Sequence, residues 1–120
     1  MNQPTILVVD DDANIRRVLV YQLNKAGYKT TAAENGKKAL ELFSKHRYQA
    51  VLTDLNMPEL SGEELLKQIK QQSPDTPVIV ISAFGGIGSA VEAIKLGAFH
   101  YLAKPLDRDE LLHTISNALR

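Results

Sequence analysis

The sequence ILVVDDD at residues 6–12 passes from four apolar residues directly into three aspartates. A short continuous apolar run of this kind is typical of a strand buried on both faces of a parallel sheet. Three further runs also pass into polar residues: AVLT into Asp54, VIVI into Ser82 and YLA at 101–103 into Lys104-Pro105. If the four runs are neighbouring parallel strands, acids, a hydroxyl and an ammonium group meet at one edge of one sheet.

The 120-residue chain has the size and composition of one globular domain. It carries 14 basic and 14 acidic side chains, and this balance argues against direct nucleic-acid binding, which usually requires an excess of basic residues. The absence of cysteine excludes disulfides and thiolate metal sites. No apolar run approaches the ~20 residues that cross a bilayer, and the first residues do not have the pattern of a secretory signal. We therefore expect no membrane association and a cytoplasmic location.

Apolar periodicity predicts five strand–helix units. We expect strands over residues 5–10, 28–33, 49–54, 78–82 and 99–103, the second at a sheet edge because it is the most polar. Helical spacing predicts helices over 13–26, from Asn35-Gly36 to near His46, after Gly62, up to Leu96 and after Asp107. Asp12 and Asp107 are the expected N-caps, and Gly27 and Gly97 suit helix C-termini. The pattern predicts a doubly wound α/β fold, (βα)5, with a five-stranded parallel sheet in the order 2-1-3-4-5.

Three aspartates are expected to meet at the carboxyl edge of this sheet. Two carboxylates ~4 Å apart repel by on the order of 4 kcal/mol at an effective dielectric constant of 20, so Asp10, Asp11 and Asp54 need a cation or hydrogen bonds. Oxygen ligands without histidine or cysteine favour Mg²⁺ or a similar ion such as Mn²⁺. The alternative for the triplet is helix capping, which accounts for Asp12 but poorly for Asp10, since Asp10 falls within the expected strand.

Asp54 is the candidate nucleophile, because an aspartate can accept a phosphoryl group as a mixed anhydride. The Lys104 ammonium could stabilise charge on that group, and the Ser82 hydroxyl could hydrogen-bond one of its oxygens. Each residue alone has a simpler interpretation: Asp54 as the start of a turn, Ser82 as a strand-terminal cap and Lys104 as a surface lysine. Their coincidence at the ends of neighbouring strands favours a phosphoryl site.

Four segments together resemble the receiver domain of two-component response regulators. They are VVDDD at 8–12, DLNMP at 54–58, Ser82-Ala83 and Lys104-Pro105, and the resemblance spans essentially the whole chain, residues 1–120. It implies a flavodoxin-like fold, dependence on Mg²⁺ and transfer of a phosphoryl group to Asp54 from a histidine kinase or a histidine phosphotransferase. It also implies that the domain catalyses its own phosphorylation and dephosphorylation without being a conventional enzyme.

The resemblance assigns metal ligands residue by residue. Asp11 and Asp54 would bind the metal directly together with the backbone carbonyl of Asn56, and Asp10 would act largely through water.

The resemblance also assigns the residues that bind the phosphoryl group and respond to it. Ser82 and Lys104 would hold its oxygens, and the Lys104–Pro105 bond would be cis. Serine replaces the commoner threonine at position 82, which keeps the hydroxyl but loses a methyl group that restricts the rotamer. Tyr101 would be the aromatic partner of the switch in the region 82–101, although an amphipathic edge residue fits the sequence equally well.

Residues after the fourth strand are candidates for the moving element. Gly85, Gly86 and Gly88 form a glycine-rich loop without the spacing of a phosphate-binding loop, and a plain flexible loop is the simpler interpretation. We hypothesise that this loop and the following helix are bistable.

Three apolar residues could receive a partner at the acidic edge. Ile15, Pro105 and Leu106 start or flank helices there, where a phosphohistidine donor must approach. The alternative for Ile15 is an ordinary core position.

The segments GAFHYL at 97–102 and KPLD at 104–107 look most like receivers attached to enhancer-binding transcription activators. An effector domain or a homodimer partner would then receive the signal. A stand-alone phosphorelay intermediate has many of the same residues and passes the phosphoryl group to a histidine phosphotransferase.

Three other functions share parts of this pattern. A haloacid-dehalogenase-type phosphatase needs a second acid where Asn56 stands. A flavodoxin-like electron carrier needs a hydroxyl-rich loop after the first strand. A docking module that is never phosphorylated would not need the acidic pocket.

Overall fold

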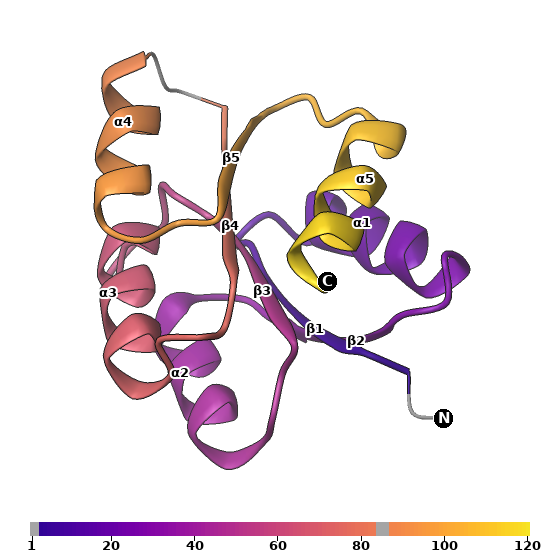
Figure 1. Ribbon diagram of the computed structural model, residues 1–120, viewed down its shortest axis with the longest axis horizontal. Helices are drawn as coiled ribbons and strands as arrows, with labels where there is room; N and C mark the ends of the chain where they lie inside the picture. The colour runs from indigo at the N-terminus through magenta and orange to yellow at the C-terminus, as the bar shows by residue number, and fades with distance from the viewer. Residues whose placement is uncertain (1–2, 84–86) are drawn as a thin grey trace.

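The computed structural model describes residues 3–83 and 87–120 and shows strands and helices in strict alternation (Figure 1). The strands are β1 (Thr5–Val9), β2 (Lys29–Ala33), β3 (Ala50–Asp54), β4 (Val78–Ser82) and β5 (His100–Ala103). The helices are α1 (Ala13–Lys25), α2 (Gly36–Lys45), α3 (Gly62–Gln72), α4 (Ile87–Lys95) and α5 (Arg108–Ala118). No helix of the described residues is long and apolar enough to cross a membrane.

The five strands form one parallel sheet in the order β2-β1-β3-β4-β5. Helices α1 and α5 cover one face, and α2, α3 and α4 cover the other (Figure 1). The predicted doubly wound fold and strand order are therefore confirmed. The partly exposed β2 lies at an edge, as its more polar sequence predicts.

Strand alternation divides the core into two layers. Val80 packs in the layer that contains Leu65 of α3, whereas the next residue, Ile81, packs in the layer that contains Leu23 of α1. Every residue of β3 and β4 is buried because helices cover both faces of the sheet, and this explains why the two strands are apolar until their polar last residues. The same alternation determines which side of the sheet edge each polar residue at a strand end occupies.

Helix caps follow the sequence closely. Asp12 accepts hydrogen bonds from the backbone N–H groups of Asn14 and Ile15, and Asp107 accepts one from Glu110. Gly27 and Gly97 have φ angles of 101° and 106° just beyond α1 and α4, where a side chain would be strained.

Two expectations about element boundaries were wrong. Strand β1 ends at Val9, so Asp10 lies just beyond the strand and not within it. Gly88 lies inside α4, which already begins at Ile87, and is not part of the preceding loop. Glycine is tolerated there because the remaining residues of α4 supply the helical pattern. The expected loop glycines Gly85 and Gly86 lie outside the described residues.

Gly62 fixes how closely α3 approaches the end of β3. A Cβ at this position would lie 2.2 Å from the carbonyl oxygen of Asp54, and the Gly62 N–H donates to the carbonyl of Leu55 at 2.9 Å. Only glycine allows this approach. The β3–α3 loop is consequently held tightly over the carboxyl end of the sheet.

Candidate functional site

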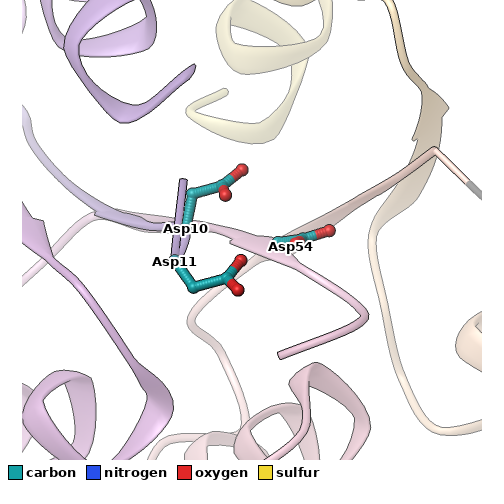
Figure 2. A group of neighbouring side chains, drawn as sticks. All are labelled: Asp10, Asp11 and Asp54. Carbon is teal, nitrogen blue, oxygen red and sulfur yellow. The ribbon is translucent and has the colours of Figure 1, made fainter. Parts of the chain in front are cut away.

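Three aspartates cluster at the carboxyl ends of β1 and β3. Asp10 and Asp54 are buried and Asp11 is exposed, and one carboxylate oxygen of each lies within 4.8 Å of the others. Figure 2 shows Asp10 and Asp11 leaving the strand end on opposite sides, with Asp54 beside them on the neighbouring strand. The arrangement follows from strand alternation and from the β1–β3 pairing, because consecutive residues point to opposite faces.

Lys104 neutralises part of this charge. Its Nζ lies 3.1 Å from Oδ2 of Asp10 and 3.5 Å from Oδ1 of Asp54, and only 13% of its side chain is exposed. The sequence assigned Lys104 to phosphoryl oxygens only, and its contact with both aspartates in the unphosphorylated protein was missed. The Lys104–Pro105 peptide bond is cis.

Asp10 is held from several directions. Its Oδ1 accepts a hydrogen bond from the backbone N–H of Asp12 at 2.9 Å, and its carbonyl accepts one from Nη1 of Arg16 at 2.7 Å. Its Oδ2 is fully buried and has no hydrogen-bond partner of good geometry among the described residues. The charge on that oxygen is balanced by the Lys104 ammonium alone within this part of the chain.

The donor set fits a hard divalent cation. It consists of carboxylate oxygens, includes one buried oxygen that lacks a hydrogen bond, and contains no histidine or cysteine. Oxygen-only donors suit Mg²⁺, Mn²⁺ or Ca²⁺ better than Zn²⁺. Asp10, Asp11 and Asp54 are therefore the described residues that could hold such an ion.

The environment of Asp54 raises the pKa of its carboxyl above the usual 3.8. Burial is the largest cause, and the negative charge of Asp10 adds to it. The charge and hydrogen bond of Lys104 and the backbone N–H of Asn56 act in the opposite direction. The ionised form of Asp54 therefore costs the folded protein some stability.

Asp54→Asn should stabilise the metal-free protein in a pH-dependent way. Below pH 3.8 the carboxyl is protonated in both the folded and the unfolded state, so the substitution should change little. As pH rises through the unfolded and then the raised folded pKa, the wild type loses stability that the amide retains. We expect the free energy of unfolding to differ by about 1 kcal/mol near pH 7. Urea denaturation in a chelator at several pH values measures this.

The control for that measurement is Asp109→Asn, since the Asp109 side chain is 85% exposed and should show little pH-dependent change. If Asp54→Asn is less stable than the wild type at pH 7, the bonds from Lys104 and Asn56 outweigh the cost of burial.

Ser82 and Tyr101 lie on the other side of the sheet edge. Ser82 is 2% exposed, and its Oγ accepts a hydrogen bond of 3.0 Å from Nδ2 of Asn56. Tyr101 is half-buried against the core layer shared with α2, α3 and α4. The sequence assigned only the carbonyl of Asn56 to the site. The bond from its side chain to Ser82 joins residues 26 apart and leaves no signal in a single sequence.

The three predicted docking residues line one groove. This groove, of about 510 Å³, lies between α1 and the segment after β5, and its walls include Ile15, Pro105 and Leu106 next to Lys104. Ile15 also packs partly against the core, which agrees with the alternative of a core position, and its part in docking stays a prediction. Val18 lines the groove and is 53% exposed, and sequence analysis did not single it out. A larger groove between α2 and α3, about 730 Å³, is lined by none of these residues.

Comparisons with known proteins agree with this geometry. A family model described as "Response regulator receiver domain" matches residues 6–116. The regulatory protein AtoC of Escherichia coli K12 is 42% identical over 115 residues, which are 96% of this chain and 25% of AtoC. The DNA-binding transcriptional regulator NtrC of E. coli K12 is 42% identical over 119 residues, 99% of this chain and 25% of NtrC. This chain therefore spans about a quarter of these curated relatives.

Comparison with a solved structure supports the same family. The receiver domain protein from Clostridium thermocellum superimposes with a TM-score of 0.92 at 34% identity, and the match covers 97% of this chain and 94% of that one. Family model, relatives and structure all cover nearly the whole chain. The chain belongs to the family of receiver domains of two-component response regulators.

Proposed function

We propose that this domain is a switch that accepts a phosphoryl group on Asp54 from the phosphohistidine of a histidine kinase, with Mg²⁺ as cofactor. One observation carries the proposal: an ammonium group contacts two buried carboxylates at the sheet edge, with a third carboxylate beside them. A purely structural site would not gather three like charges around a single counter-charge. We expect the domain to act in the cytoplasm.

The transfer step exchanges one bond for another. An Asp54 carboxylate oxygen attacks phosphorus, the O–P bond forms, and the N–P bond of the phosphohistidine breaks, with its electron pair leaving on the imidazole nitrogen. Bound Mg²⁺, held by Asp11, Asp54 and the Asn56 carbonyl, with Asp10 acting through water, would neutralise charge on the transferring group. Lys104 is already close to Asp54 and needs only a small movement to bind a phosphoryl oxygen.

Ser82 and Tyr101 would transmit the change. Ser82 pairs with Ala103 and Val80 pairs with Tyr101, so the two residues occupy adjacent strands on the same face. A hydroxyl drawn toward the phosphoryl group would leave space on that face, into which an aromatic side chain could move. The intervening segment 84–86 lies outside the described residues.

The output of the switch follows from the relatives by analogy. AtoC is named a regulatory protein and NtrC a DNA-binding transcriptional regulator, and both are about four times as long as the match. We propose that phosphorylation here controls an effector domain or a homodimer contact. The alternative is a phosphorelay intermediate that donates to a histidine phosphotransferase. Asn56 disfavours the phosphatase alternative, because no acid stands two residues after Asp54.

Transfer from a protein phosphohistidine tests the function directly. A kinase or phosphotransferase labelled on histidine should lose its label to this chain when Mg²⁺ is present. A chelator should stop the transfer, because the acidic cluster then lacks its cation. Transfer that proceeds equally well in the chelator would contradict the proposed mechanism.

Val18→Lys should slow this transfer by about tenfold or more, since it places a charge in the apolar groove where the donor is proposed to dock. Phosphorylation by a small acyl phosphate needs no docking and should keep its rate. Tyr21→Lys is the matched control: Tyr21 lies on the same helix, is 62% exposed and does not line the groove. Equal slowing by both variants would argue against docking at this groove.

A further inference from the structure

We propose that the side chain of Asn56 is a positioning residue that holds the Ser82 hydroxyl away from Asp54 in the unphosphorylated domain. The inference rests on the proposed function, since it concerns how easily phosphorylation changes the conformation of the domain. Phosphorylation would have to release this hydroxyl from Asn56 before it could bind a phosphoryl oxygen. Asn56 would therefore set the balance between the two states.

The contact joins two segments whose backbones are already fixed. Nδ2 of Asn56 donates to Oγ of Ser82 at 3.0 Å. The N–H of Leu55 donates to the carbonyl of Ile81 at 2.8 Å, and the N–H of Lys104 donates to the carbonyl of Ser82 at 2.9 Å. With the main chain anchored on both sides, rotation of the Ser82 side chain is the change that requires the least rearrangement.

Strand alternation places the hydroxyl on the far side of the sheet edge. Val80 belongs to the core layer of α2, α3 and α4, and Ser82, two residues later, continues that side of β4. Leu52 belongs to the layer of α1 and α5, and Asp54 continues that side of β3. The Asn56 amide therefore holds the hydroxyl on the side opposite to the Lys104–Asp54 pair.

Serine makes this restraint necessary. A threonine has a second heavy atom on Cβ, which restricts its rotamers, whereas serine rotates more freely. At position 82 the hydrogen bond from Asn56 supplies the restriction that a methyl group would give. A neutral hydrogen bond contributes a factor of about 2–10 to such an equilibrium.

The proposal is tested by a double-mutant cycle on the binding of beryllofluoride, a mimic of the phosphoryl group, in the presence of Mg²⁺. Asn56→Ala should bind the mimic about 2–10-fold more tightly than the wild type, because the hydrogen bond from Asn56 no longer has to break. In a Ser82→Ala background the same substitution should have no effect. Unchanged or weaker binding by Asn56→Ala, or an equal gain without Ser82, would overturn the proposal.

Two controls separate this effect from damage to the site. The affinity for Mg²⁺ alone should be the same in Asn56→Ala and in the wild type, since the proposed ligand is the backbone carbonyl, which the substitution keeps. A single cooperative thermal transition in each variant would show that both variants fold. A loss of Mg²⁺ affinity as large as the gain in beryllofluoride affinity would also count against a simple restraint.

A measurement without phosphoryl chemistry keeps the inference separate from the proposed function. In NMR spectra of the metal-free protein, the side-chain amide protons of Asn56 should shift upfield when Ser82 is replaced by alanine. If the wild type binds no beryllofluoride, the proposed function fails, and this shift still decides whether Asn56 restrains Ser82. An unchanged amide resonance would overturn the restraint.

Discussion

Incubated with Mg²⁺ and acetyl phosphate, the wild-type chain should gain about 80 Da, and the Asp54→Asn variant should gain nothing. An ionised carboxylate oxygen is a nucleophile, whereas the amide of asparagine has nearly the same shape but no comparable reactivity. Among the described residues, Asp54 is the buried acid at the end of β3, and Lys104 contacts it. We therefore expect the effect of its replacement to be all or none. Mass spectrometry of the intact chain measures it, and peptide mapping locates the adduct.

Asp12→Asn is the matched control for this experiment. Asp12 belongs to the same aspartate triplet, but it is exposed and caps α1 through bonds to two backbone N–H groups. Asparagine caps helices about as well as aspartate, so this variant should fold normally and keep the adduct. An adduct that survives in Asp54→Asn, or that maps to a histidine, would refute Asp54 as the acceptor.

The same experiment separates the alternative functions. A receiver accumulates the modified aspartate, whereas a docking module that is never phosphorylated shows no adduct in any variant. A phosphatase would release phosphate continuously and would need a general acid, which position 56 does not supply.

The parts of the site that sequence analysis could predict are those fixed by the strands. The run at residues 78–82 is buried throughout, and its end coincides with the end of β4 at Ser82. Hydrophobic period is a local property, and the rules for strand connections restrict the strand order, so the meeting of Asp10, Asp54 and Lys104 at one edge followed from the two together.

The parts that could not be predicted depend on side-chain direction between distant segments. The bond from Asn56 to Ser82 depends on how the β3–α3 loop packs against the sheet. The exposure of Val18 in the groove depends on how α1 packs against it. Periodicity places Val18 on a helix but does not show that its neighbours leave it half uncovered. For Gly88 the prediction was wrong for a different reason. Glycine favours loops, but at this position it lies inside helix α4.

The second large effect concerns stability. In a chelator, Lys104→Met should lower the free energy of unfolding by about 3 kcal/mol, because it leaves the buried charge of Asp10 without its ammonium partner. Lys104 is slightly exposed, so the cost should fall at the lower end of the range for buried ion pairs. Urea denaturation measures the loss. Lys95→Met, at an exposed position in the last turn of α4, is the control and should change stability little.

Two rescues would show that charge, and not lost packing, causes this defect. Asp10→Asn combined with Lys104→Met should recover most of the stability, because the fully buried side chain of Asp10 is then neutral and Asp54 still accepts the backbone N–H of Asn56. Mg²⁺ at ten times its dissociation constant should add roughly 1.4 kcal/mol to the wild type, and more at the same Mg²⁺ concentration to Lys104→Met, where a cation also replaces the missing ammonium. If the double variant stays as unstable as the single one, the methylene chain of Lys104 stabilises the pocket more than its charge does. The acidic edge would then not be a site of unbalanced negative charge that favours a bound cation, and the proposed phosphoryl chemistry depends on such a site.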